Sequence, residues 1–316
     1  MKPARIVFPG FWFGESDWSV AKEQAKRGVG GFCLYGATAD QTQQFVQEMQ
    51  EASPYGHLLI CADIEEDLSE VVKDAPVLPS NEELGATTDT EGAYRKGLIS
   101  ARMARSLGIN WLLAPVVDVG YQSPAFGENP MSVARMAGDY VAGVSNGGVL
   151  NCVKYFPGVS GILKTLAQME DAEFVPYKHM FRRADAVMPS DMVFPNIDPS
   201  SRAMMSENII KGLLKKRLNY KGCVIGAPLH KSRIKNEAAA ALKMIHCGVE
   251  MIMAPRDSQA VLDMVEREFD RGNIVDAVIH SISNHEMFTS KVMSFAMTPF
   301  SVEESFEQAK NFKKIK

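Results

Sequence analysis

Long apolar runs and clustered basic residues are scarce in this sequence, and we expect neither a signal peptide nor a membrane or nucleic-acid partner. No apolar run approaches the ~20 residues needed to span a bilayer, and residues 1–9 contain no long apolar stretch followed by a small-residue cleavage site. The 34 basic and 38 acidic residues are interspersed, so there is no basic surface of the kind that binds nucleic acid. We therefore expect a cytoplasmic protein that binds neither membranes nor nucleic acid.

The sequence also has few residues suited to disulfides, metals or nucleotides. Its five cysteines form no C-x-x-C pair, and an odd number argues against a complete disulfide framework. The six histidines show no metal-ligand spacing such as H-E-x-x-H, and no G-x-G-x-x-G follows the first predicted strand. We expect buried cysteines in a reducing compartment, no metal and no cofactor.

Short apolar runs alternate with helical patterns along most of the chain. The predicted strands are residues 5–8, 31–35, 58–63, 111–115, 149–154, 186–188, 222–225 and 250–253. The clear predicted helices are residues 18–27, 40–52, 88–107, 131–145, 207–217 and 232–246. Eight such units favour a (β/α)₈ TIM-type barrel, a single α/β domain over residues 1–297, and a doubly wound open sheet is the alternative. Residues 298–316 form a polar tail with one weak helix, 302–312.

Charged and polar residues follow several predicted strands, where barrel proteins place their working residues. Asp63 ends the third strand, Asp118 follows the fourth, Lys154 and Tyr155 end the fifth, and Asp191 follows the sixth. Carboxylates and a lysine bind the hydroxyl groups of a polyhydroxylated ligand well. The alternative is that Lys154 forms a structural salt bridge with a neighbouring aspartate, and the residues alone favour neither.

Five segments resemble glycoside hydrolase family 3, particularly the single-domain β-N-acetylhexosaminidases of bacterial cell-wall recycling. The resemblance runs from about residue 28 to residue 292 and implies the barrel fold. Among the segments, Lys154-Tyr-Phe-Pro-Gly158 resembles the family's K-H-F-P-G, and Leu107 to Val119 contains its A-P-V-x-D-V pattern. The other three segments are residues 124–130, 205–222 and 240–253.

The resemblance also exposes two losses in the family's catalytic machinery. The family's nucleophile is the first aspartate of an S-D-D-L-type motif after the seventh strand, and Ala227 stands at that position. An alanine cannot form a glycosyl-enzyme intermediate. The hexosaminidases carry an Asp-His acid/base pair in the loop after the fifth strand, and residues 159–173 contain no histidine.

The family's sugar-binding residues are partly replaced as well. Tyr155 stands in place of the histidine in K-H, Pro124 in place of an arginine, and Asp191 in place of a histidine after the sixth strand. Asp63 keeps the family's aspartate. The resemblance therefore implies a protein related to carbohydrate hydrolases that has lost hydrolysis. It would keep a pocket for a carbohydrate or other small polar ligand, lined by Asp63, Asp118, Lys154, Tyr155, Asp191 and Trp12.

One alternative is a divergent, active glycosidase of the hexosaminidase type. Asp191, Glu65 or Glu66 would act as the nucleophile, and Glu170 or Glu173 would act as the acid. Two carboxyl groups facing each other across the pocket, one with a raised pKa, would support this hypothesis.

Two further alternatives use other features of the same face. Lys154 could form a Schiff base if burial lowered its pKa. The barrel could also be a scaffold for a protein partner of unknown identity, since 18 methionines and the aromatic run Phe8 to Phe13 suit adaptable contacts. Trp12 in that run would either stack on a sugar face or fill the pocket.

Overall fold

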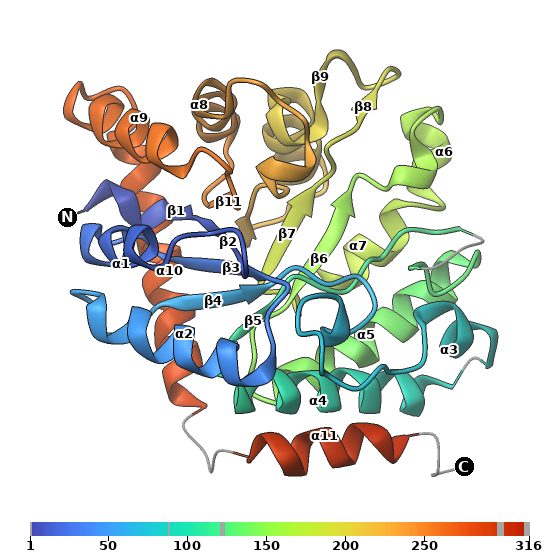
Figure 1. The fold of residues 1–316 in the computed structure, drawn as a ribbon. Helices are drawn as coiled ribbons and strands as arrows, with labels where there is room; N and C mark the ends of the chain where they lie inside the picture. The colour runs from blue at the N-terminus through green and yellow to red at the C-terminus, as the bar shows by residue number, and fades with distance from the viewer. Residues whose placement is uncertain (1, 88, 121–123, 296–299, 313–316) are drawn as a thin grey trace.

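The computed structural model describes residues 2–87, 89–120, 124–295 and 300–312. Parallel strands lie inside a layer of helices (Figure 1). The strands are β1 (Val7–Phe8), β2 (Gly10–Trp12), β3 (Gly31–Tyr35), β4 (Leu59–Ala62), β5 (Trp111–Leu112), β6 (Cys152–Phe156), β7 (Ala186–Pro189), β8 (Val193–Phe194), β9 (Asp198–Arg202), β10 (Cys223–Val224) and β11 (Ile252–Met253). All eight predicted strands are found, and β2, β8 and β9 are additional.

The strands pair in parallel and in chain order around the sheet. One ladder runs β2-β3-β4-β5, a second runs β6-β7-β10, and β1 pairs with β11. Single parallel bridges, Trp111 to Leu150 and Ile225 to Met251, connect these ladders. The short antiparallel pair β8-β9 lies outside this arrangement. The result is a TIM-barrel-like α/β fold in which the carboxyl ends of the parallel strands share one side of the molecule, here called the mouth.

Helices cover the outside of the strands. They are α1 (Trp18–Arg27), α2 (Ala39–Ala52), α3 (Asn81–Thr87), α4 (Thr90–Ser106), α5 (Pro130–Asn146), α6 (Leu166–Glu170), α7 (Phe174–Met180), α8 (Glu237–Cys247), α9 (Ser258–Asp270), α10 (Val275–Ser294) and α11 (Val302–Lys310). Five of the predicted helices correspond to α1, α2, α4, α5 and α8, while Thr88 lies outside the described residues. Helices α3, α6, α7, α9 and α10 were not predicted.

Local sequence signals explain where several helices begin and end. Asp17 caps α1 by accepting a hydrogen bond from the Ser19 amide, and Thr38 forms a capping box at α2. Gly28 and Gly248 end α1 and α8 with φ angles of 95° and 99°, a backbone region that favours glycine. The predicted helix 207–217 is a wider, π-type helix, Asn208–Arg217, in which four apolar side chains enter the core.

The core lies between the strands and the helices. The strand residues Phe8, Phe32, Ile60 and Val153 are completely buried, as expected for a parallel sheet covered on its outer face. All five cysteines are free and buried, which confirms the prediction of buried, unpaired thiols. Burial raises the pKa of the Cys223 thiol, so this group remains a neutral core residue.

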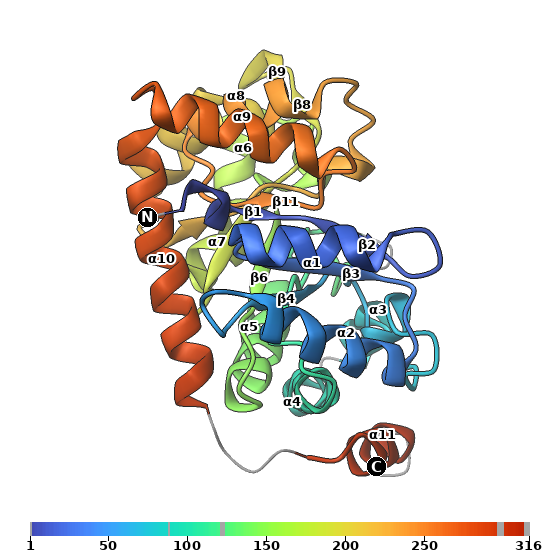
Figure 2. The ribbon, with the colours of Figure 1, turned by 60° about the vertical axis from the view of Figure 1, so that its left-hand side comes forward.

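The last two helices lie at the edge of the fold. Helix α10 runs along one side of the molecule, and α11 packs against α4 (Figure 2). Helix α11 corresponds to the helix predicted in the polar tail, of which residues 298, 299 and 313–316 lie outside the described residues. Within the described part of the chain, no helix is long and apolar enough to cross a membrane.

Candidate functional site

A buried aspartate contacts two lysines at the mouth. Asp63 follows β4, and its Oδ1 accepts a hydrogen bond from the Nζ of Lys154 in β6 at 3.0 Å. Both of these side chains are fully buried. The Nζ of Lys231, from the 3₁₀ turn Leu229–Lys231 after β10, lies 2.6 Å from Oδ2 of Asp63. Burial raises the pKa of Asp63, but the two lysines outweigh burial and hold this pKa at about 2.

Aromatic rings lie beside this charged cluster. Trp12 at the end of β2 stacks on Tyr35 at the end of β3, with ring centroids 5.2 Å apart and planes inclined by 9°. His230 presents its ring edge to both, at 4.9 and 4.8 Å, and the Arg256 guanidinium lies 5.2 Å from the Trp12 ring. Burial lowers the pKa of His230 to about 4, so this imidazole is neutral near pH 7.

A second group of acids lies around Tyr155 and the loop after β6. Tyr155 donates its hydroxyl hydrogen to Oε1 of Glu65 at 2.6 Å. Asp118 is partly exposed, and its Oδ1 accepts a hydrogen bond from the Val159 amide at 3.0 Å. Burial raises the pKa of Asp118 to about 7, with further contributions from the charges of Glu173 and Glu65. Asp118 is therefore the carboxyl group of the mouth that is poised to hold a proton near neutral pH.

The loop after β6 folds over Glu173. This side chain is fully buried, and its Oε1 accepts hydrogen bonds from Lys164 at 2.5 Å and Ser160 at 3.2 Å. Its Oε2 is buried without a hydrogen-bond partner among the described residues. Glu170, which the sequence offered as an alternative acid, instead pairs with Lys178 and Arg217 on the helical surface. The structure thus brings Glu173, and not Glu170, close to Asp118.

Asp191 does not join the Asp63–Lys154 pair. Its Oδ2 accepts a hydrogen bond from Arg202 of β9 at 2.7 Å, and partial burial raises its pKa. Asp191 thus forms a separate ion pair, and its predicted place in the lining of the same pocket stays a prediction. Strand β9, which lies outside the strand-helix repeat, supplies Asp191 with its own cation.

Ala227 is almost completely buried and belongs to the core. The segment that carries it continues into His230 and Lys231, the two residues that contact the aromatic pair and Asp63. Sequence analysis did not single out His230, Lys231, Tyr35 or Arg256. Lys231 could have been identified from the sequence, because it follows Ala227 in the segment after the seventh predicted strand.

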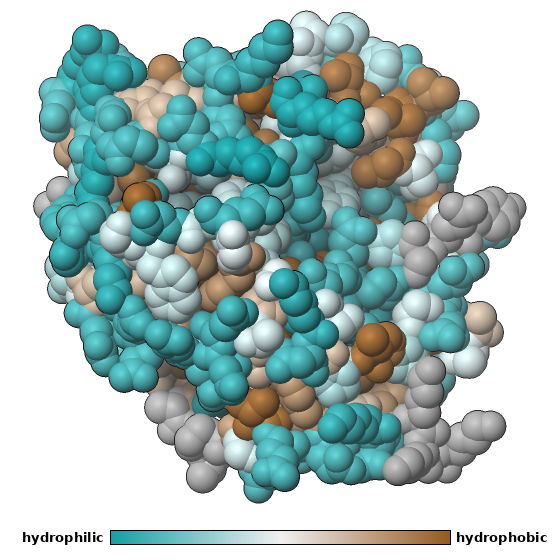
Figure 3. Space-filling view, in the orientation of Figure 1, coloured by the Kyte–Doolittle hydropathy of each residue, from teal (hydrophilic) through white to brown (hydrophobic). Residues whose placement is uncertain are grey.

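The mouth is open on the face seen in Figure 3, which is hollowed near its middle where the strand arrows of Figure 1 end. Apolar side chains gather beside this hollow, over α6 and the β8-β9 pair, and both Leu163 and Met192 are exposed.

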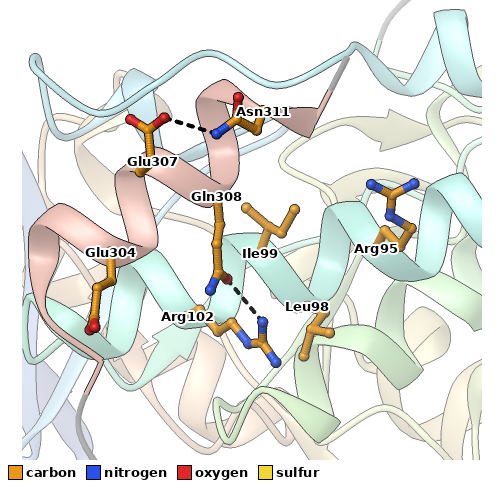
Figure 4. Close-up of a pocket in the computed structure, with 8 residues that line it drawn as sticks. All are labelled: Arg95, Leu98, Ile99, Arg102, Glu304, Glu307, Gln308 and Asn311. Atoms are coloured by element: carbon orange, nitrogen blue, oxygen red, sulfur yellow. Dashed lines mark hydrogen bonds between the residues drawn. The ribbon is translucent and has the colours of Figure 1, made fainter. Parts of the chain in front are cut away.

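A separate groove lies away from the mouth, between α4 and α11 (Figure 4). Among the described residues, no group of three or more His, Cys, Asp or Glu side chains could hold a metal ion.

A TIM-barrel-like α/β fold with charged and aromatic side chains at the carboxyl ends of its strands defines a protein with the architecture of barrel enzymes. Comparison with known families identifies which family of barrel proteins the chain belongs to. Residues 15–285 match the glycosyl hydrolase family 3 N-terminal domain, and the chain belongs to this family.

Individual relatives agree with this assignment. The chain is 28% identical over 226 residues to a beta-N-acetylglucosaminidase/beta-glucosidase of Cellulomonas fimi, covering 62% of this chain and 40% of the relative. It is 24% identical to a beta-hexosaminidase of Idiomarina loihiensis, and the match covers 73% of this chain and 77% of that relative. The structure of a family 3 beta-N-acetylglucosaminidase from Paenibacillus superposes with a TM-score of 0.86 at 24% identity, covering 99% of this chain and 68% of that one. The chain thus spans less than half of the Cellulomonas relative.

Proposed function

We propose that this chain is a family 3 barrel that has lost glycoside hydrolysis and keeps a pocket for a carbohydrate or similar small polar ligand. We also propose that the parallel strands β1 to β7, β10 and β11 form a closed barrel within residues 1–297. The parallel ladders and the two single bridges support closure, and the backbone hydrogen bond from Gly30 to Val7 joins the β1-β11 pair to the segment that begins β3. The ligand class is inferred from the family and from the hexosaminidase names of the relatives.

One observation carries the loss of hydrolysis. The segment that would present the nucleophile presents Ala227, and four residues later it places Lys231 on Asp63. Both carboxylate oxygens of Asp63 therefore face a lysine amino group. A sugar hydroxyl that bound Asp63 would have to displace Lys231, and no carboxylate stands at residue 227 to attack the sugar.

The aromatic pair supports retained ligand binding. Trp12 and Tyr35 are only partly buried, and such a flat ring surface at a pocket mouth suits stacking against the apolar face of a sugar. Lys154 stays beneath Asp63 and fixes its position. We infer that a ligand would lie between the Trp12 ring and the Asp63 carboxylate once Lys231 has moved.

The test is hydrolysis of chromogenic β-N-acetylglucosaminide and β-glucoside substrates by the native protein, the Ala227→Asp variant and the Ala227→Asp/Lys231→Ala double variant. We expect no turnover by the native protein. Turnover by the double variant would further support a sugar-shaped pocket. Native turnover that survives purification over several columns and is abolished by a single carboxyl substitution would overturn the proposal.

A second candidate function is supported by the acids around Lys154. The raised pKa of Asp118 beside Glu65 and Glu173 resembles the arrangement in which one carboxyl group donates a proton and another remains ionised. In a divergent glycosidase, Asp118 would be the acid and Glu65 the base or nucleophile. Asp118→Asn and Glu65→Gln would then each abolish native turnover, whereas Asp191→Asn, which changes a group paired with Arg202, would not.

A further inference from the structure

At the mouth, three cationic side chains of the protein contact the groups that we expect to bind a ligand. Lys154 and Lys231 contact Asp63, and the Arg256 guanidinium lies against the Trp12 ring. Carboxylates and electron-rich aromatic rings are the groups with which proteins bind ammonium ions. The groups that a ligand would meet once Lys231 has moved are thus groups that attract positive charge.

The two lysines on Asp63 differ in how firmly they are held. The Lys154 side chain is fully buried, whereas the Lys231 side chain is 49% exposed and belongs to a single 3₁₀ turn. The Oδ2 atom of Asp63 is buried, and within the described part of the chain it receives no hydrogen bond of good geometry. Lys231 therefore pairs with this oxygen by charge and proximity, and its half-exposed side chain makes it the partner of Asp63 that a ligand could replace.

We propose that Oδ2 of Asp63 is the binding position for the protonated primary amine of an amino sugar, which replaces the amino group of Lys231. This inference rests on the proposed function, because it names the ligand class of the same pocket. The sugar ring would lie against the Trp12–Tyr35 pair. Lys231 would then be a built-in competitor that keeps the pocket closed to ligands lacking a positive charge.

The exchange conserves charge at the buried carboxylate. An incoming ammonium restores the positive charge that Lys231 removes when it leaves, whereas a neutral sugar leaves only Lys154 beside Asp63. A hydrogen bond between two charged partners is about twice as strong as one between neutral partners. Asp63 remains ionised throughout the neutral range, and His230 is neutral there, so the imidazole adds no positive charge beside the ligand.

Isothermal titration with glucosamine, N-acetylglucosamine and glucose at pH 6 tests this inference. These probes share a pyranose ring and differ at the carbon-2 substituent. We expect Lys231→Met to bind glucosamine about tenfold or more tightly than the native protein does. Binding of N-acetylglucosamine and glucose should tighten by a clearly smaller factor, because a neutral hydroxyl forms a weaker hydrogen bond with the freed carboxylate oxygen than an ammonium does. Lys235→Met, which removes an exposed lysine four residues away, should behave like the native protein.

Two further measurements keep the test decisive. Asp63→Asn in the Lys231→Met background should abolish the preference for the amine. Lys231→Gln removes the charge with little change in length, and it serves if the methionine variant unfolds. Equal gains in affinity for all three sugars would overturn the proposed amine position at Asp63. No gain in affinity for glucosamine in a folded Lys231 variant would overturn it as well. Native glycoside turnover would instead overturn the proposed function, so the two failures are distinguishable.

Discussion

The Nζ of Lys164 lies 2.5 Å from Oε1 of Glu173, and this contact joins a lysine that is 39% exposed to a carboxylate that is fully buried. Glu173 begins the turn into α7, and Lys164 lies in the loop between β6 and α6. The other oxygen of Glu173 has no hydrogen-bond partner among the described residues. A surface lysine therefore compensates the charge of the buried acid, and this ion pair acts together with the hydrogen bonds of Ser160 and Val159 to hold the loop.

Lys164→Met should destabilise the fold by about 2 kcal/mol. Removing one partner leaves a buried charge uncompensated, which costs ~3–5 kcal/mol in a fully buried pair, and the partial exposure of Lys164 reduces this cost. Urea unfolding measures the change. The control is Lys178→Met, which breaks the more exposed pair with Glu170 and should cost less than ~1 kcal/mol. Equal effects of the two variants would contradict a special role for the Lys164–Glu173 contact.

The sequence alone predicted the part of the site that follows from strand order. Asp63 and Lys154 end two predicted strands of one parallel sheet, so their side chains had to emerge on the same side. The salt-bridge alternative left the aspartate unnamed, and the structure shows that Asp63 is the partner of Lys154. The family and its barrel-like fold also followed from short motifs near strand ends.

The remaining contacts lie in segments whose paths no periodic pattern encodes. Lys231 reaches Asp63 through a 3₁₀ turn, and Arg202 reaches Asp191 from the antiparallel pair β8-β9. Neither element repeats the strand-helix unit, so hydrophobic periodicity does not position it. Similarly, the choice between Glu170 and Glu173 depends on how the loop after β6 turns, and both residues look equivalent in the sequence.

The raised pKa of Asp118 predicts a specific pH dependence of stability. Its pKa is about 7 in the folded protein and 3.8 as the reference value, so between these values the unfolded chain loses a proton that the folded chain keeps. Asp118 therefore costs no stability below about pH 4, and its cost grows as pH rises toward 7. Asp118→Asn should raise the free energy of unfolding at pH 8 by roughly 1–3 kcal/mol more than at pH 4.

Unfolding titrations at the two pH values provide this comparison. The asparagine can still accept the hydrogen bond of the Val159 amide, so the variant changes charge with little change in shape. Asp171→Asn, at an exposed position in the same region, is the matched control and should show the native pH dependence. If Asp118→Asn changed the free energy of unfolding by the same amount at pH 4 and at pH 8, Asp118 would be ionised in the folded protein throughout this range.

Gly158→Ala should loosen the loop over Glu173. Gly158 has a φ angle of 114°, which non-glycine residues adopt only with strain, and a Cβ there would lie 2.7 Å from Cγ of Glu173. We expect a loss of about 1–3 kcal/mol and faster proteolysis of the loop. Gly120→Ala, where a Cβ would meet nothing within 4 Å, is the control. A stable, protease-resistant Gly158→Ala variant would argue against close packing of this loop.

Tyr155 and Glu65 should show a measurable coupling, because Tyr155 donates a 2.6 Å hydrogen bond to Glu65 beside the ion pair of Lys154. Tyr155→Phe removes the hydroxyl group but keeps the ring that lies 5.0 Å from the Lys154 amino group, so it should cost only about 1 kcal/mol. In a double-mutant cycle with Glu65→Ala, we expect a coupling of about 1 kcal/mol in the free energy of unfolding. Strict additivity would mean that Glu65 points to solvent, free to act on a ligand, and would favour the divergent glycosidase. A clear coupling would instead mean that Tyr155 holds Glu65 as part of the scaffold, which leaves Asp63 as the acid that meets the ligand.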